Sequence, residues 1–281
     1  MIAVGAGTLY LVGTPIGNLE DLTDRARRVL GEVDVVAAED TRRTGRLLAS
    51  IGVSVRLLSF FEGNEAGRTA EVVALVQSGS NVALVSDAGM PSVSDPGYRL
   101  VAACVEAGLA VDVVPGPSAV LAALVLSGLP TDRFAFEGFL PRSGKARTSR
   151  LAAVAAEPRT VVLFESPKRV AATLRELSGG DGQRRVAVCR ELTKLHQEVI
   201  RGSLAEVVAL VGDRDLKGEV VVVLAGAQPA AGAEEPLAVA RRLVADGVPK
   251  REAARQARAA AGGSTRDIYE GLLAEDRAAA D

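Results

Sequence analysis

Short apolar runs alternate with longer amphipathic segments along the first 116 residues. Apolar runs of six or seven residues, rich in Val, Leu and Ala, are typical of strands buried on both faces, and they lie at residues 8–13, 34–40, 55–60, 81–87 and 110–116. Between them, residues 21–33, 41–53, 65–79 and 98–108 place apolar side chains on one face of a helix. This alternation predicts an α/β domain of right-handed βαβ units with a mainly parallel sheet.

Beyond residue 116 the predicted strands follow one another more closely. They lie at residues 133–140, 159–166, 184–192, 197–203 and 218–226, and helices are expected near 145–156, 169–177 and 204–211. We therefore expect a second α/β domain with a mixed sheet at residues 117–226. Residues 227–236 have the Ala, Gly and Pro content of a linker, and residues 237–281 predict a small C-terminal domain of two or three short helices.

Composition indicates the kind of core. Apolar residues make up 48% of the 281-residue chain, aromatic residues only 3%, and Trp is absent. We therefore expect a core of Val, Leu and Ala, which suits a parallel sheet covered by helices. The formal net charge of −2 gives no sign of a nucleic-acid partner, although a local basic patch would be sufficient for one.

Cysteine and histidine content argues against a metal site. Cys104 and Cys189 are isolated and His196 is the single histidine, so the sequence has no zinc-ligand spacing. We interpret the cysteines as small core residues and His196 as structural, and we expect a reducing, cytoplasmic location. No apolar run approaches about 18 residues, and no basic segment precedes the first one, so neither a membrane span nor a signal peptide is expected.

Polar loops rich in Gly or Pro follow all five strands of the first domain. In chain order they read TPIGNLEDLT, AEDTRRT, FFEGNE, SDAGMPSVSDPG and PGPSA. The carboxyl ends of parallel strands meet at one edge of a sheet, where open α/β sheets bind ligands. Neither G-x-G-x-x-G nor G-x-x-x-x-G-K-[ST] follows a strand, which disfavours a phosphate-cradling nucleotide site. The sequence therefore predicts a ligand site built from shaped backbone at this edge.

Eight motifs occur in a fixed order: TPIGNLEDLT, AEDTRRTGRLL, SDAGMPSVSDPG, PGPSAVLAAL, GLPTDRFAFEGFLPR, FESPKR, RELTK and KGEVVVVL. Together they resemble the bacterial small-subunit ribosomal RNA cytidine 2′-O-ribose methyltransferases, which belong to the tetrapyrrole methylase superfamily of S-adenosylmethionine enzymes. The resemblance spans about residues 8–226. It implies two α/β domains, 16S RNA of the small ribosomal subunit as the substrate, and a homodimer, as superfamily members generally are.

The resemblance also implies that S-adenosylmethionine lies in a cleft between the two α/β domains and is held largely by backbone. The positions that match the family's cofactor site are Thr14, Pro15, Ile16, Asp87, Ala88, Gly89, Ser94, Asp95, Ser118, Ala119, Phe139, Leu163 and Glu219. Gly89 allows the backbone to approach a ligand closely. Met90 stands where the family usually has Thr, so this chain lacks a hydroxyl at that position.

Methyl transfer to a ribose hydroxyl is an in-line displacement, and the weak nucleophile benefits from a proton acceptor. The single histidine lies outside the edge loops, which leaves carboxylates as candidates: Asp40, Glu65 and Glu165. Structural roles compete with this interpretation. Asp40 could cap the following helix, and Glu65 could be a first-turn acid.

Arg and Lys near the loops are candidates for contacts with RNA phosphates. They are Arg42, Arg43, Arg142, Lys145, Arg147, Arg150, Lys168 and Arg169, with Lys250, Arg251, Arg255 and Arg258 on one side of a helix in the tail. Each group could instead be a solvated helix face. Two other functions stay open: methylation of a tetrapyrrole carbon, and a non-catalytic RNA-binding assembly factor on the same fold. The basic run at 142–150 and the helical tail favour RNA over a macrocycle.

Overall fold

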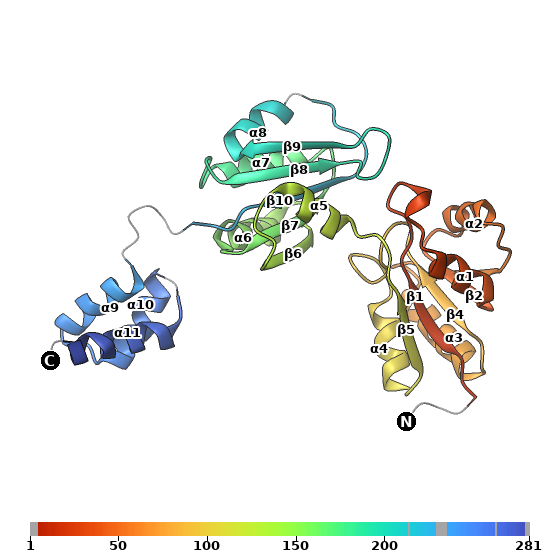
Figure 1. The fold of residues 1–281 in the computed structure, drawn as a ribbon, viewed down its shortest axis with the longest axis horizontal. Helices are drawn as coiled ribbons and strands as arrows, with labels where there is room; N and C mark the ends of the chain where they lie inside the picture. Colours follow the sequence, from red (N-terminus) through yellow and green to blue (C-terminus); the bar gives the residue numbers. More distant parts are fainter. Residues whose placement is uncertain (1–4, 213, 229–234, 262, 279–281) are drawn as a thin grey trace. The chain divides into compact units, whose positions relative to one another are not determined.

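The protein forms two compact units, Met1–Gly226 and Ala227–Asp281, and each is described by itself. The structure is a computed structural model that describes residues 5–212, 214–228, 235–261 and 263–278, with side chains described up to residue 275. The first unit contains two five-stranded sheets (Figure 1). The second unit is helical.

The first sheet is entirely parallel, as the alternating pattern predicts. Its strands are β1 (Thr8–Val12), β2 (Val35–Ala38), β3 (Arg56–Ser59), β4 (Val82–Val85) and β5 (Ala110–Val114), in the order β3-β2-β4-β1-β5. Every neighbouring pair runs parallel, so all five carboxyl ends lie along one edge. The loops that carry the motifs therefore gather at that edge.

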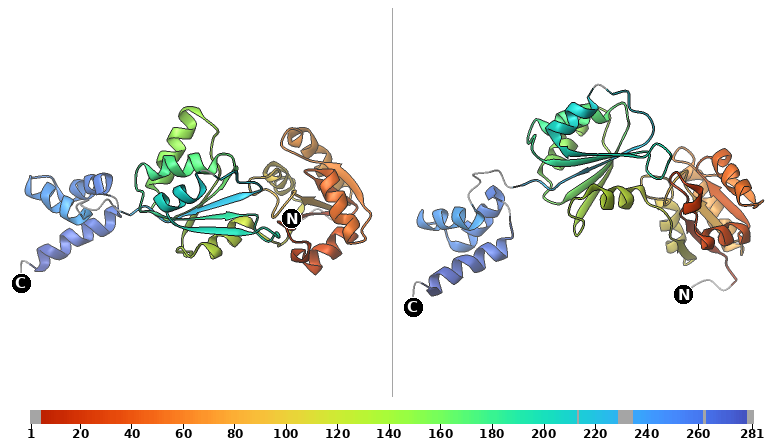
Figure 2. Two further views of the ribbon diagram at one scale, coloured as in Figure 1. Left: turned by 90° about the horizontal axis from the view of Figure 1, so that it is seen from above. Right: turned by 45° about the horizontal axis from the view of Figure 1, so that its top comes forward.

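Helices cover both faces of this sheet (Figure 2). Alternate residues of β2 face opposite sides: Val35 packs with α3 (Glu65–Gln77) and α4 (Tyr98–Glu106), and Val36 packs with α1 (Asp24–Glu32) and α2 (Thr41–Ser50). The helix expected from residue 21 begins three residues later. Thr23 caps α1 by accepting from the Ala26 N–H, and a short 3₁₀ helix, η1 (Leu19–Asp21), precedes it.

The second sheet is mixed, as predicted. Its strands are β6 (Phe134–Phe139), β7 (Thr160–Glu165), β8 (Arg185–Arg190), β9 (Glu198–Ser203) and β10 (Val220–Leu224), in the order β6-β7-β10-β8-β9. The pair β6–β7 is parallel and the other pairs are antiparallel. One face packs against α6 (Gly144–Ala156), α7 (Val170–Ser178) and α8 (Leu204–Val211).

The opposite face of the second sheet is covered by α5 (Ala119–Ser127), which the hydrophobic pattern does not predict. Residues 119–126 are all apolar, so this helix has no polar face and gives no helical periodicity. Ser118 caps it by accepting from the Leu121 N–H, and Cys189 of β8 packs beneath it. Both Cys104 and Cys189 are free and buried, in agreement with their interpretation as core residues.

The second unit contains α9 (Pro236–Ala245), α10 (Lys250–Ala261) and α11 (Thr265–Ala278) around a small core that includes Val239, Ala254 and Ile268. Most of the predicted linker, residues 229–234, lies outside the described residues. The predicted domain borders at 116/117 and 236/237 stay predictions. Among the described residues, no helix is both long and apolar enough to cross a membrane.

Candidate functional site

The loop at residues 86–97, between β4 and α4, has an unusual backbone. Gly89 and Gly97 have positive φ angles of 80° and 138°, and Ser92 and Ser94 adopt left-handed angles of 70° and 65°. Left-handed backbone is unfavourable for residues other than Gly, so several turns of this loop are held by their surroundings. The small residues of the motif thus fold into a tightly constrained wall.

Two reciprocal backbone hydrogen bonds attach this loop to the end of β1. The Thr14 N–H donates to the Gly89 carbonyl at 2.9 Å, and the Gly89 N–H donates to the Thr14 carbonyl at 3.0 Å. The Thr14 hydroxyl also donates to the Ser86 carbonyl at 3.2 Å. Thr14 is buried, so these bonds are shielded from water and fix the loop against the sheet.

A cavity of about 300 Å³ lies against this loop. It is called the donor cavity here because the sequence resemblance predicts a methyl donor at several of its residues. Its walls come from both sheets of the first unit: Ile16, Ala88, Gly89, Met90, Val93, Ser94, Asp95, Ser118, Ala119, Val120, Phe139, Phe164, Glu165, Ser166, Pro167, Gly218, Glu219, Val220 and Val221. Phe164 packs against Phe136 and Phe139, with ring centroids 5.0 and 5.4 Å apart. The cavity therefore combines an apolar wall with three carboxylates, which are Asp95, Glu165 and Glu219.

The three carboxylates have different surroundings. Burial raises the pKa of Asp95 to about 6, and the negative charges of Glu39 and Asp87 add to this effect, whereas a hydrogen bond from the Ser86 hydroxyl opposes it. Burial also raises the pKa of Glu39. At neutral pH, Asp95 is a carboxylate whose proton affinity is well above that of an ordinary aspartate.

Glu165 is almost completely buried and fully engaged. Its Oε1 accepts the Ser166 N–H at 2.7 Å and pairs with Arg169 Nη2 at 2.6 Å, and its Oε2 accepts the Thr173 hydroxyl at 2.7 Å. These partners hold the carboxylate in one orientation. Glu165 is therefore placed to shape the cavity wall.

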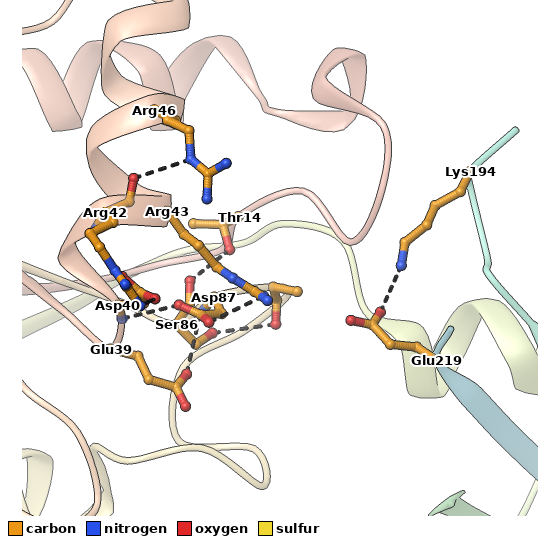
Figure 3. A network of polar contacts seen from close by, with 11 residues as sticks. Thr14, Glu39, Asp40, Arg42, Arg43, Arg46, Ser86, Asp87, Lys194 and Glu219 are labelled. Carbon is orange, nitrogen blue, oxygen red and sulfur yellow. Dashed lines mark hydrogen bonds and ion pairs between the residues drawn. The ribbon is translucent and has the colours of Figure 1, made fainter. Parts of the chain in front are cut away.

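Glu219 is held by the RELTK loop, to which the motif pattern assigns no site residue. Lys194 Nζ lies 3.1 Å from Glu219 Oε2 (Figure 3). The same nitrogen lies 2.8 Å from Glu191 Oε1. Glu191 and Thr193 have positive φ angles of 51° and 63°. RELTK is one of the motifs, but only the left-handed backbone, which sequence does not reveal, shows how the loop positions Lys194.

A second hollow, here called the side cavity, has a volume of about 470 Å³. Its lining is Thr14, Pro15, Leu19, Arg43, Thr44, Arg46, Leu47, Ser50, Ser86 and Asp87. Figure 3 shows Arg43 reaching from α2 toward Asp87, and Arg43 Nη1 lies 3.3 Å from Asp87 Oδ2. The 86–97 loop forms part of both cavities: Ser86 and Asp87 line the side cavity, and Ala88, Gly89 and Met90 line the donor cavity.

The predicted cofactor residues divide between the two cavities. Those that line the donor cavity are Ile16, Ala88, Gly89, Ser94, Asp95, Ser118, Ala119, Phe139 and Glu219. Thr14, Pro15 and Asp87 line the side cavity instead. Leu163 lines neither, because it points into the core on the other face of β7, and its neighbour Phe164 lines the donor cavity. The side chain of Leu163 therefore lies away from the cavity, and its contact with the cofactor stays a prediction.

Of the three predicted catalytic acids, Glu165 lines the donor cavity. Asp40 caps α2 and pairs with Arg42 at 2.9 Å, and the hydrogen bonds from Arg42 hold the pKa of Asp40 well below its usual range. Glu65 is buried and accepts the Gly97 N–H at 2.9 Å. Asp40 thus stabilises the turn after β2, and Glu65 stabilises the 86–97 loop. Neither side chain lines a cavity.

The candidate RNA-contacting residues of the first compact unit fall into two groups. Arg42, Arg43, Arg142, Lys145, Arg150 and Lys168 have exposed side chains. Arg147, by contrast, is largely covered and bonds to Glu176, the Thr173 hydroxyl and the Pro141 carbonyl, and Arg169 pairs with Glu165. Their guanidinium groups are committed to the packing of α6 and α7.

The tetrapyrrole (corrin/porphyrin) methylases match this chain over residues 8–208. The chain belongs to the tetrapyrrole methylase family. Within the family it is 45% identical over 278 residues to "Ribosomal RNA small subunit methyltransferase I" of Mycobacterium tuberculosis, covering 98% of this chain and 97% of that relative. Proteins of the same name from Synechocystis and Thermotoga maritima are 48% and 50% identical, over 89% and 78% of this chain and 91% and 99% of theirs.

Solved structures of tetrapyrrole methylases share the fold. Uroporphyrin-III C-methyltransferase from Thermus thermophilus superimposes with a TM-score of 0.56 at 26% identity, covering 77% of this chain and 94% of that one. A cobalt precorrin-4 methyltransferase gives a TM-score of 0.59 at 16% identity, covering 78% and 94%. The two-sheet α/β fold expected from the sequence is therefore confirmed.

Proposed function

We propose that this chain transfers the methyl group of S-adenosylmethionine to the ribose 2′-hydroxyl of a cytidine in the 16S RNA of the small ribosomal subunit. One observation carries the proposal: tetrapyrrole methylases named for small-subunit ribosomal RNA are 45–50% identical to this chain across most of its length. Identity to a methylase that acts on a tetrapyrrole is 26%. The geometry of the donor cavity supports the methyl-donor half of the reaction.

The donor cavity has the chemistry that S-adenosylmethionine requires. The molecule carries a sulfonium cation, an amino acid group, a ribose and an apolar adenine. Phe139, Phe164 and Val221 would pack against its apolar parts, and Glu219 would face its polar groups. Gly89 brings backbone to the cavity wall without a side chain, so the donor would contact peptide groups there. The predicted cofactor residues that line this cavity are accordingly proposed to hold the donor.

S-adenosylmethionine supplies an activated methyl group, and the protein must place the ribose oxygen about 3–3.5 Å from it, in line with the sulfur. We propose that Asp95, which lines the donor cavity, accepts the proton of the 2′-hydroxyl. Among the described residues, the Ser86 hydroxyl is the one side chain that donates a hydrogen bond to Asp95. Asp95 would take the proton as the oxygen–carbon bond forms, and would release it to solvent afterwards. The three acids expected from the sequence are less suited because each already has a partner. Asp40 caps α2 and pairs with Arg42, Glu65 accepts the Gly97 N–H, and Glu165 pairs with Arg169.

RNA would reach this site through exposed cations. We propose contacts from Arg42, Arg43, Arg142, Lys145 and Lys168, whose side chains extend into solvent, and place Arg147 and Arg169 behind them as residues that fix α6 and α7.

We further propose a homodimer. Leu121 and Val125 on α5 are 53% and 70% exposed, and an equilibrium sedimentation mass of one chain would contradict this proposal.

Methyl transfer from labelled S-adenosylmethionine tests the function directly. The protein is incubated with unmethylated small ribosomal subunits, with naked 16S RNA, and with a tetrapyrrole precursor. Label is expected in RNA, at the 2′-oxygen of one cytidine. Label confined to the tetrapyrrole would overturn the proposal in favour of the macrocycle alternative, and calorimetry without any binding of S-adenosylmethionine would favour a non-catalytic RNA-binding factor.

A further inference from the structure

The side cavity has an unusual pairing of charges. Arg43 and Asp87 face each other at its wall, and the side chains are 57% and 25% exposed, so both retain access to solvent. Asp87 Oδ1 accepts the Asp40 N–H at 3.1 Å, which leaves Oδ2 directed toward Arg43. In this pair Arg43 uses its Nη1 nitrogen. A guanidinium has five N–H donors in total, so Arg43 keeps others for a ligand. The wall therefore offers N–H donors and a carboxylate acceptor side by side.

A neutral pair of this kind is poorly suited to a phosphate. The charge of Arg43 is compensated by Asp87, and a phosphate oxygen at Arg43 would lie close to that carboxylate. It is well suited to the edge of a neutral base that has a donor beside acceptors. Cytosine has such an edge: its N4 amino group donates, and its N3 and O2 accept. Uracil has a carbonyl oxygen in place of the amino group, which would face the carboxylate of Asp87 unfavourably.

The other lining residues fit a nucleotide whose base enters this cavity. Pro15, Leu19 and Leu47 give the cavity an apolar side, and Leu19 is 54% exposed, an apolar side chain that a base could cover. Arg46 also lines the cavity, and its Nε donates a long hydrogen bond of 3.4 Å to the Arg42 carbonyl. In the part of the chain that the structure describes, no carboxylate pairs with Arg46, which suits it for a backbone phosphate.

The two cavities are adjacent because they share the 86–97 loop. Asp87 lines the side cavity, while Ala88 and Gly89, the next two residues, line the donor cavity. Hydrogen bonds between Thr14 and Gly89 hold this shared wall in place. A nucleotide whose base occupies the side cavity therefore has its ribose next to the donor cavity, where the reacting hydroxyl must be.

We propose that the side cavity is the base-recognition pocket for the target nucleotide, in which Asp87 accepts the amino group of an unstacked cytosine and Arg43 donates to its O2 and N3. This inference rests on the proposed RNA methyltransferase function and adds the residues that select the base. Enzymes that modify a nucleotide within folded RNA read its Watson–Crick edge after unstacking it. Arg46 would hold a phosphate of the same strand.

The test compares small-subunit RNA with the target cytidine against the same RNA with uridine at that position. The ratio of kcat/KM for cytidine over uridine is measured for the unaltered protein, Asp87→Asn and Arg43→Gln. Both variants are expected to lower the ratio about tenfold or more, because each removes one of the paired contacts that distinguish the bases. A residue with a merely structural role would lower both rates together and leave the ratio unchanged.

Asp112→Asn is the matched control, because Arg25 and Asp112 form another exposed pair, 2.8 Å apart, in the same sheet domain. This variant should keep the ratio of the unaltered protein. Calorimetry with S-adenosylmethionine is run on every variant. If Asp87→Asn weakens donor binding by disturbing the loop, the ratio is taken from Arg43→Gln, whose side chain is outside the donor cavity.

The base-pocket proposal would be overturned if Asp87→Asn and Arg43→Gln still bind S-adenosylmethionine and keep the kcat/KM ratio of the unaltered protein for cytidine over uridine. Tighter binding of both RNAs by Asp87→Asn, with no change in ratio, would also overturn it and would indicate a phosphate site. Failure of the unaltered protein to methylate either RNA would overturn the proposed function itself. The two failures are therefore distinguishable.

Discussion

Asp95 and Glu165 are carboxylates on the wall of one cavity, yet their surroundings differ. Glu165 is fixed by three hydrogen-bond donors, which belong to Ser166, Thr173 and Arg169. Asp95 is surrounded by Glu39 and Asp87, which oppose its charge, and has the Ser86 hydroxyl as a donor. A group that must accept a proton near neutral pH needs the second kind of environment.

At the residue scale, the raised pKa of Asp95 predicts the pH dependence of methyl transfer. The acceptor is the deprotonated form, so the rate should rise through about pH 6 and level off above it. The negative charges of Glu39 and Asp87 contribute to this raised pKa, so removing either charge should move the midpoint to lower pH. A single-turnover rate that stays flat from pH 5 to pH 8 would contradict the assignment of Asp95.

Asp95→Asn keeps the shape of the side chain and removes its basicity. The variant should lose about 10²- to 10⁴-fold in kcat, a loss larger than any change in its affinity for S-adenosylmethionine. Glu65→Gln serves as the control, because Glu65 binds the same loop through the Gly97 N–H but lies outside both cavity walls. A larger loss of kcat in Glu65→Gln than in Asp95→Asn would indicate that loop position, and not proton transfer, limits the reaction.

At the element scale, the 86–97 loop matters because one rigid segment forms walls of two cavities. The loop is held by the buried Thr14 bridge and by the carboxylate of Glu65 on the Gly97 N–H, and these contacts offset the unfavourable left-handed backbone of Ser92 and Ser94. A loop held at so many points changes little on binding. A substitution that shifts it should therefore affect methyl-donor affinity before it affects global stability.

Gly89→Val tests this loop, with Gly52→Val as its control. Both glycines have a positive φ, 80° and 72°, so both substitutions introduce similar backbone strain. A Cβ at Gly89 would lie 3.5 Å from Ile16 Cγ2, whereas a Cβ at Gly52 would meet no atom within 4 Å. Calorimetry should show at least about tenfold weaker binding of S-adenosylmethionine for Gly89→Val only. Equal, unaltered affinities in both variants would refute the placement of the donor.

At the scale of the whole molecule, both cavities belong to the first compact unit, since all of their lining residues lie between Thr14 and Val221. The second unit has its own core of Val239, Ala254 and Ile268. The match to the Thermotoga maritima relative covers 99% of that protein but only 78% of this chain, so that relative is shorter. Because all lining residues lie in the first unit, binding of the methyl donor should not require the helical tail.

A chain that ends at Gly226 is expected to bind S-adenosylmethionine with an affinity within about twofold of the full chain, because no lining residue is removed. The exposed Arg251, Arg255 and Arg258 of α10 would be lost, and affinity for RNA should fall with a shallower salt dependence. Circular dichroism should show that both proteins are folded. A truncated chain that folds but does not bind S-adenosylmethionine would contradict the independence of the first unit.

The amino-acid sequence by itself determined the two α/β sheets, their parallel and mixed character, and the edge at which the motifs gather. Hydrophobic periodicity is local, and strand–helix alternation leaves few topologies open. It did not reveal α5, because a helix that is apolar on every side has no periodic signal. Nor did it reveal that the side chain of Phe164, and not that of Leu163, lines the cavity.

Only the tertiary structure decided which polar residues meet. Asp40 and Asp95 are both loop aspartates in sequence, but one is neutralised by Arg42 beside it, and the other lies buried among Glu39 and Asp87. The pair of Arg43 with Asp87 joins residues 44 positions apart, and Lys194 joins Glu219 across 25. Proton affinity and hydrogen bonding depend on distances across the fold, and a linear pattern does not contain those distances.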